Sequence, residues 1–317
     1  MTASLPVAAP PARGWRHRHL LDVDQLSRDE LVGILELAVE MRTRRAAGER
    51  LHALAGEAVG LAFYEPSTRT RVSFELAARV LGADTVDLSV AGSSVTKGES
   101  LADTLRTLDR TGITIIVLRH AAAGAPYEAC RAVEAARIVN AGDGRHAHPT
   151  QALLDALTLR EALGGLEGRR LAIVGDVAHS RVARSNITCL TRLGAEVVLG
   201  GPAAWVRGFD AAYPGVRVAA TLADALRGAD AVMTLRVQLE RAAAAGIGPV
   251  DAYVRDWSLT SERLDRWAPA AWVLHPGPTN EGVEISAELA ASARSLIGRQ
   301  VENGVPVRMA ALARLAG

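Results

Sequence analysis

Short apolar runs that alternate with helical patterns restrict the possible folds of this chain more than any other feature. The first series of runs lies at residues 59–65, 84–90 and 113–120, and helical patterns at about 70–81 and 101–110 separate them. The second series, also interrupted by helical patterns, lies at 169–176, 195–201, 216–220, 230–236 and 270–276. Strands that alternate with helices form parallel sheets, because a parallel connection has to cross over the sheet. We therefore predict an α/β fold with two doubly wound parallel-sheet domains joined by helices.

The length of the chain agrees with two domains, since 317 residues are many for one hydrophobic core. A capping box at Ser27 and Glu30 predicts the start of the first helix. The last helical pattern runs from about Ala287 to Leu315. We expect a disordered Pro- and Ala-rich tail over 1–14, a first domain over 15–148, a connecting helix over 149–164, a second domain over 165–296 and a C-terminal helix over 297–317 that returns to the first domain.

Two segments, 91–100 and 238–260, are too long and too polar or glycine-rich for tight turns, so we predict mobile loops there.

Composition excludes several classes of protein. Lys and Arg total 36 against 35 Asp and Glu, so the chain lacks the large net positive charge with which proteins bind nucleic acid or a membrane surface. No apolar stretch approaches the roughly 20 residues of a bilayer span, and the N-terminus lacks a signal-peptide pattern, so we expect a cytoplasmic protein. Cys130 and Cys189 lie in separate helical patterns, and we predict inert thiols rather than a disulfide or a metal site.

The densest group of hydrogen-bond donors follows the apolar run that ends at Tyr64. It consists of Ser67, Thr68, Arg69, Thr70 and Arg71. A junction between a strand and a helix presents unpaired backbone N–H groups and the positive end of the helix dipole, both of which favour a phosphate. Capping a helix requires one hydroxyl, not three hydroxyls and two guanidinium groups. The cluster therefore predicts an anion site.

This segment, "STRTR", resembles the carbamoyl-phosphate site of the transcarbamoylases, and later motifs narrow the resemblance to the aspartate carbamoyltransferase family, catalytic chain. The resemblance covers nearly the whole chain from Trp15. It implies that Ser67, Thr68, Arg69 and Thr70 bind the phosphate, with the active site in the cleft between the two domains.

Two further motifs resemble the carbamoyl-phosphate site of the family. Arg119 ends the run "VLRH", and the resemblance implies that it contacts the phosphate and the carbamoyl oxygen. In "HPTQ", His148 would polarise the carbamoyl oxygen and Gln151 would meet the carbamoyl amino group. Asp143 and His146 taken alone suggest a metal site, and a core or capping role for the histidine is a further alternative, but the family pattern implies no metal.

The turn "VGDVAHSRVARSN" looks like a dinucleotide site, but it carries one glycine where that fingerprint needs three, which disfavours NAD. By resemblance, Arg181 in this turn binds the aspartate carboxylate; the alternative is an ordinary surface charge, with Arg184 a solvated neighbour. "LRVQLER" adds Arg236 and Gln238 to the aspartate-binding group; the alternative is a run of charges on a helix face.

The segment "HPGPTNEGVEI" separates two branches of the family, because ornithine enzymes usually carry His-Cys-Leu-Pro at this place. The resemblance implies that Pro276 contacts carbamoyl phosphate and that Gly277 and Pro278 contact aspartate. Glu281 departs from the pattern, since the aspartate family often has arginine there, and the departure puts one expected ion pair in doubt.

The segment "SSVTKGES" supplies Ser93 and Lys97, which by resemblance enter the active site of a neighbouring subunit of a homotrimer. Some relatives carry two adjacent lysines, whereas Thr96 stands in the first place here. The alternative is a solvated loop lysine.

The resemblance implies transfer of the carbamoyl group of carbamoyl phosphate to L-aspartate in pyrimidine (UMP) synthesis, with no cofactor and no metal. Arg69, Thr70, Arg119 and His148 are the expected catalytic residues. The alternatives are ornithine carbamoyltransferase, disfavoured by Arg236 because a second arginine would repel an ornithine ammonium, a non-catalytic paralogue, and an NAD-binding oxidoreductase. The resemblance leaves open whether a regulatory chain or a dihydroorotase binds.

Overall fold

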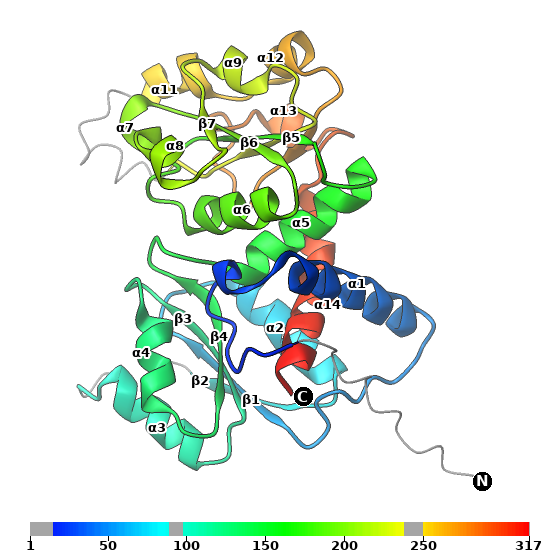
Figure 1. Cartoon of the computed structure of the whole chain (residues 1–317), viewed down its shortest axis with the longest axis vertical. Helices are drawn as coiled ribbons and strands as arrows, with labels where there is room; N and C mark the ends of the chain where they lie inside the picture. Colours follow the sequence, from blue (N-terminus) through cyan, green and yellow to red (C-terminus); the bar gives the residue numbers. More distant parts are fainter. Residues whose placement is uncertain (1–14, 89–97, 238–249, 317) are drawn as a thin grey trace. The chain divides into compact units, whose positions relative to one another are not determined.

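The chain divides into two compact units, each built around its own parallel sheet (Figure 1). Unit 1 comprises residues 1–150 and 304–317, and unit 2 comprises residues 151–303. The computed structural model describes residues 15–88, 98–237 and 250–316, so the predicted tail over 1–14 lies outside the described residues.

Unit 1 contains a four-stranded sheet in the order β2-β1-β3-β4, and every strand pair in it is parallel. Its strands are β1 (Ala58–Phe63), β2 (Asp84–Leu88), β3 (Ile115–His120) and β4 (Arg137–Asp143). Its helical elements are η1 (Val23–Gln25), α1 (Arg28–Ala46), α2 (Thr68–Val80), α3 (Leu101–Arg110) and α4 (Ala125–Ala132). Figure 1 shows α3 and α4 on one face of the sheet and α1 and α2 on the other, as in a doubly wound fold.

Unit 2 contains a five-stranded sheet in the order β7-β6-β5-β8-β9, which is also parallel throughout. Its strands are β5 (Arg170–Val174), β6 (Glu196–Gly200), β7 (Arg217–Val218), β8 (Ala231–Thr234) and β9 (Trp272–Leu274). Its helices are α6 (Arg181–Arg192), α7 (Ala203–Val206), α8 (Phe209–Ala212), α9 (Leu222–Leu226), α11 (Val250–Trp257), α12 (Ser261–Trp267) and α13 (Ala287–Ala290). The prediction of two parallel-sheet α/β domains is confirmed.

Two long helices contain the boundaries between the units. α5 (Pro149–Leu163) begins in unit 1 and ends before Gly164, whose φ of 71° suits a helix C-terminus. α14 (Ile297–Ala316) begins in unit 2 and ends in unit 1. There Arg314 donates to the carbonyl of Gly33 in α1, and Arg308 lies over the ring of Phe74 in α2.

The strands read as nearly continuous apolar runs because helices cover both faces of a parallel sheet. β1 and β3 are almost entirely buried, whereas β2, at the edge of its sheet, is largely exposed and carries Asp84 and Asp87. Charges on an edge strand oppose unwanted pairing with another sheet. The capping box predicted at Ser27 and Glu30 is confirmed, since both of its hydrogen bonds form.

Several expectations from the sequence were wrong. β4 was not predicted, and the expected strand at 216–220 is reduced to the two residues of β7. The loop predicted over 238–260 contains α11, which forms because Tyr253 and Trp257, four residues apart, both enter the core of unit 2. Of the other predicted loop, residues 91–97 lie outside the described residues.

The single helix expected over 287–315 is two helices, α13 and α14. The chain leaves the helical conformation between them because it pairs with β9 instead. The N–H of Val273 donates to the carbonyl of Arg294, and the N–H of Leu296 donates to the carbonyl of Val273.

Both cysteines lie in helices, as predicted: Cys130 in α4 and Cys189 in α6. Cys189 is buried, and burial raises the pKa of the half-buried Cys130 thiol to about 11. Within the described part of the chain, no helix is long and apolar enough to cross a membrane.

A tight turn after β4 depends on Gly144. Its φ is +45°, and a Cβ at this position would lie 2.6 Å from the backbone nitrogen of Ala123. Its N–H donates to the carbonyl of His120 at the end of β3. The turn brings the chain from β4 to His148, so its geometry determines where α5 begins.

We expect Gly144→Ala to lower the free energy of unfolding by about 3 kcal/mol or more, because backbone strain and a backbone clash add. Gly56→Ala is the matched control: its φ is +83°, but no atom lies within 4 Å of the added Cβ. Strain alone should cost about 1 kcal/mol there. Urea unfolding of both variants measures the difference. Equal losses would show that the close approach to Ala123 has no energetic consequence.

Candidate active site

Most of the residues predicted to bind carbamoyl phosphate lie at the ends of three neighbouring strands of the sheet in unit 1, whereas Gln151 and Pro276 belong to unit 2. Ser67–Thr70 follow β1, Arg119 is the penultimate residue of β3, and His148 follows β4. β1, β3 and β4 are adjacent in the sheet and parallel, so their carboxyl ends lie side by side at the same end of the sheet (Figure 1). Open parallel sheets bind their ligands at the carboxyl ends of the strands.

The N-terminus of α2 differs from the other described helix starts that have a Ser or Thr N-cap residue. Ser67 is its N-cap residue, but its side chain accepts no hydrogen bond from the helix. The other Ser and Thr N-cap residues of the described helices each accept one: Ser27, Ser100, Ser180, Thr221, Thr260 and Ser286. The first turn of α2 also contains no acidic residue. The start of α2 is therefore suited to an anion.

The first backbone hydrogen bond of α2 runs from the N–H of Arg71 to the carbonyl of Ser67. The N–H groups of Thr68, Arg69 and Thr70 precede that bond, and within the described ranges no group accepts them. Thr70 is buried, whereas Thr68 and Arg69 are exposed. Together these groups offer backbone donors, hydroxyls and one guanidinium to a ligand.

The two arginines of the cluster separate. Arg71 pairs with Asp87 in β2 at 3.0 Å and lies 3.7 Å from Glu75 on its own helix. Arg69 forms no ion pair with any residue that the structure describes. The sequence pattern could not distinguish them, because Asp87 is distant in the chain.

Arg119 is held at the carboxyl ends of the strands by two contacts. Its Nη2 lies 2.6 Å from Glu65 Oε1, and its Nη1 donates to the carbonyl of Ala141 at 3.2 Å. The side chain is buried. Glu65 was not among the predicted site residues, although it directly precedes the "PSTRT" segment.

His148 is buried and enters α5 from a turn fixed by Asp143. The Asp143 carboxylate accepts bonds from the N–H of Gly124, the side-chain amide of Asn140 and the N–H of Ala147. It also lies 3.1 Å from Nδ1 of His146. These contacts give Asp143 a structural role in the turn, and no group of three or more His, Cys, Asp or Glu side chains suited to a metal occurs in the described ranges.

In unit 2, the predicted aspartate-binding residues repeat the arrangement of unit 1. Arg181 follows β5 as the first residue of α6, Arg236 follows β8, and Gly277 and Pro278 follow β9 directly after Pro276, which was predicted to contact carbamoyl phosphate. β5, β8 and β9 are adjacent in their sheet. Gln151, whose Nε2 donates to Asp155 at 2.9 Å, lies in the first turn of α5.

The two arginines that follow β5 lie in different environments. Arg184 donates to the carbonyl of Ala178 and lies 5.1 Å from the centre of the Phe209 ring, so the alternative of a merely solvated side chain was wrong. Arg181 is half-buried at the helix start, and Arg236 is exposed.

A buried histidine shapes the turn after β9. The N–H of Gly277, whose φ is 64°, donates to Nδ1 of His275 at 2.8 Å. His275 Nε2 lies 3.1 Å from Glu284 Oε1, and both side chains are fully buried. Because Nδ1 accepts, the proton of a neutral imidazole is on Nε2 and points at the carboxylate.

Three predicted residues, Ser93, Lys97 and Gln238, lie outside the described residues. Glu281 is exposed, and its backbone pairs with Ile285.

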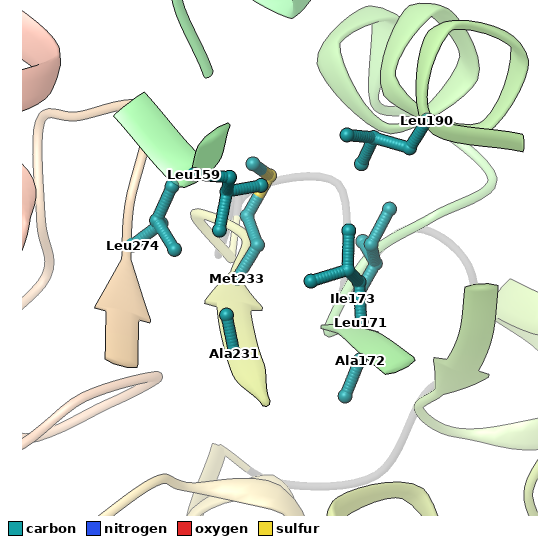
Figure 2. A pocket seen from close by; sticks show the side chains of 8 residues that line it. All are labelled: Leu159, Leu171, Ala172, Ile173, Leu190, Ala231, Met233 and Leu274. Atoms are coloured by element: carbon teal, nitrogen blue, oxygen red, sulfur yellow. The ribbon is translucent and has the colours of Figure 1, made fainter. Parts of the chain in front are cut away.

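A small pocket in the core of unit 2 is not a candidate binding site. Figure 2 shows side chains of α5, α6 and three strands around it. All eight are apolar: Leu159, Leu171, Ala172, Ile173, Leu190, Ala231, Met233 and Leu274. A charged amino acid or a phosphate would lose its hydration there without compensating hydrogen bonds.

Comparisons with known proteins match both units. Residues 18–161 match the family model described as aspartate/ornithine carbamoyltransferase, carbamoyl-P binding domain. Residues 167–315 match the model described as aspartate/ornithine carbamoyltransferase, Asp/Orn binding domain.

Individual relatives resemble the chain over nearly its full length. The aspartate carbamoyltransferase catalytic subunit of Roseiflexus castenholzii is 48% identical over 318 residues, covering 99% of each chain. The solved aspartate transcarbamoylase of Trypanosoma cruzi in complex with N-(phosphonacetyl)-L-aspartic acid has a TM-score of 0.86 at 32% identity, covering 96% of this chain and 98% of that one. The ornithine carbamoyltransferase of Pyrococcus furiosus has a TM-score of 0.84 at 26% identity, covering 95% and 97%.

The two family models and these relatives span both units and all the strand ends described above. The chain belongs to the aspartate/ornithine carbamoyltransferase family.

Proposed function

We propose that this protein transfers the carbamoyl group of carbamoyl phosphate to the amino group of L-aspartate, giving N-carbamoyl-L-aspartate and phosphate, a step of pyrimidine biosynthesis. The observation that carries the proposal is the N-terminus of α2, where the N-cap hydroxyl does not bind the helix and the first turn has no acidic residue. Solved relatives from Trypanosoma cruzi hold carbamoyl phosphate with aspartate, and carbamoyl aspartate with phosphate. These ligands are the two sides of the proposed reaction.

In this account the phosphate binds at the start of α2. Ser67, Thr68 and Thr70 offer hydroxyl and backbone donors, and Arg69 supplies a guanidinium. Each charge-assisted hydrogen bond contributes roughly 1.5–3 kcal/mol. Arg119, held by Glu65 beside this helix start, is placed to contact the phosphate and the carbamoyl oxygen together.

The chemistry requires no covalent enzyme intermediate. The aspartate amine attacks the carbamoyl carbon, a C–N bond forms, and the C–O bond to phosphate breaks. Negative charge develops on the carbamoyl oxygen, where Thr70, Arg119 and His148 stabilise it, and loss of one such donor typically costs 10²- to 10³-fold in rate. The leaving phosphate accepts the proton of the amine.

Aspartate has two carboxylates, and the residues that follow β5, β8 and β9 suit them. Arg181 and Arg236 supply positive charge, while Gly277 and Pro278 supply backbone groups from the turn shaped by His275. Gln151 and Pro276 contact the carbamoyl group, and Gln238 and Lys97 complete the aspartate site. Two guanidinium groups favour a dicarboxylate over ornithine, whose side chain ends in an ammonium.

The proposed assembly is a homotrimer in which Ser93 and Lys97 of one subunit enter the site of the next. An exposed apolar face of α2 supports it: Val72 and Leu76, four residues apart on the helix, are both exposed. A second copy of the chain is the occupant that we propose for this face. The cytoplasmic location stays a prediction.

Arg69→Ala is expected to lower kcat/KM for carbamoyl phosphate at least a hundredfold and to leave the melting temperature nearly unchanged, because an exposed side chain contributes little packing. Arg79→Ala, at the other end of α2, is the matched control and should stay within twofold of wild type, since among the described residues Arg79 contacts Glu75 and Thr85 rather than the predicted site. Steady-state kinetics of the folded variants decide. Normal turnover by Arg69→Ala would remove Arg69 from the site.

The shared site is tested by mixing two inactive variants, Arg69→Ala and Lys97→Ala. The two variants are unfolded together in equal amounts and reassembled. About three quarters of the trimers then contain both variants. Each such trimer has one subunit boundary at which an intact Arg69 faces an intact Lys97. Roughly one quarter of wild-type sites should return, because a cyclic trimer has three equivalent junctions. If demonstrably exchanged trimers stay inactive, Lys97 does not act across a subunit boundary.

A further inference from the structure

The fully buried carboxylate of Asp155 in unit 2 accepts hydrogen bonds from side chains of three helices. Gln151 of α5 donates to its Oδ1 at 2.9 Å, and Gln300 of α14 donates to the same oxygen at 2.7 Å. Asn186 of α6 donates to its Oδ2 at 2.8 Å. An ionised carboxylate away from water is tolerated only when such donors compensate it. α5, α6 and α14 are therefore tied to one charge.

The contact with Asp155 fixes which end of the Gln151 amide can face a ligand. Its nitrogen donates to the carboxylate, so the amide oxygen lies on the opposite side of the group. An amide oxygen accepts hydrogen bonds, which suits the N–H groups of a carbamoyl moiety. A flipped amide would place two oxygens against each other at Asp155.

Gln300 continues the chain of contacts to the turn after β9. Its Nε2 donates to Asp155, and its Oε1 accepts the N–H of His275 at 3.0 Å. The amide nitrogen of Gln300 faces an acceptor and its amide oxygen faces a donor, so only one orientation of the amide makes both hydrogen bonds. Gln300 is buried and lies distant in the chain from both partners.

His275 and Glu284 connect Gln300 to the two segments that contain the proposed aspartate-binding residues. Glu284 Oε1 accepts the N–H of Asn280 at 2.6 Å, and the Asn280 side chain donates to the carbonyl of Val237 at 2.8 Å. Val237 directly follows Arg236, and Asn280 follows the Gly277–Pro278 turn. One buried network thus reaches from Gln151 to both segments.

We propose that Gln300 is a positioning residue of the reaction: through Asp155 and His275 it holds the amide of Gln151 and the 276–280 turn in register. This inference rests on the proposed function. Gln300 touches no reacting atom in this account. It acts by fixing groups that do, and a misplacement of about 1 Å can cost on the order of a hundredfold in rate.

The test compares Gln300→Met with Asn303→Leu. Methionine keeps the shape of the side chain but makes neither hydrogen bond, and we expect kcat/KM for aspartate to fall about tenfold or more. Asn303 is the matched control: it lies one turn further along α14, is equally buried, and donates to Thr158 and Glu161 of α5, which are not among the network residues named above. Asn303→Leu should lower the melting temperature but leave kcat and both KM values within twofold.

Gln300→Glu adds a second measurement that does not depend on the folding of the first variant. A carboxylate at 300 still accepts from His275 but repels Asp155, whereas a protonated carboxyl donates to Asp155 again. Repulsion raises the pKa of the new carboxyl, so activity relative to wild type should rise severalfold as pH falls from 9 to 6. The same ratio for Asn303→Leu should stay flat.

The positioning role would be overturned if Gln300→Met folds and has wild-type kinetic constants. It would also be overturned if the activity of Gln300→Glu relative to wild type does not change with pH. The proposed function would still hold in either case, provided that the wild-type protein carbamoylates aspartate. Failure of the wild-type protein to carbamoylate aspartate would overturn both.

Discussion

Parallel strand pairing is the constraint on which the rest of this structure depends. Every strand of the two sheets runs in the same direction as its neighbours, so all carboxyl ends of a sheet lie at one edge. Residues fifty positions apart, such as Arg69 and Arg119, therefore lie at the carboxyl ends of neighbouring strands. In unit 2, Arg181, Arg236 and the turn at Gly277 likewise follow neighbouring parallel strands. In each sheet, residues far apart in the sequence are brought to one end of the sheet.

Buried carboxylates then fix the groups that the sheets gather. Asp143 orders the turn before His148, Asp155 orients the amide of Gln151, and Glu284 orders the turn after β9. Each accepts several N–H groups, which offsets the cost of removing a charge from water. The carboxylates that order His148, Gln151 and the turn after β9 are themselves buried inside the fold.

Much of this could be predicted from the sequence, because the strongest signals are local. Apolar runs and the capping box at Ser27 depend on residues a few positions apart, and "STRT" and "HPGP" are contiguous motifs. β4 was missed because buried Asn140 interrupts its apolar run; that side chain bonds to the carbonyl of Leu21. Gln300 was missed because its partners lie far away in the chain, although the Gln151–Asp155 spacing of four residues on one helix face was visible.

A product assay on the wild-type protein measures whether aspartate is the amine that accepts the carbamoyl group. Purified protein is incubated with carbamoyl phosphate and either L-aspartate or L-ornithine at equal concentration, and the carbamoylated product is measured colorimetrically. The account predicts rapid formation of N-carbamoyl-L-aspartate and at most trace citrulline, because Arg181 and Arg236 attract two carboxylates and repel an ammonium. Citrulline as the main product, or no carbamoylated product with either amine, would contradict it.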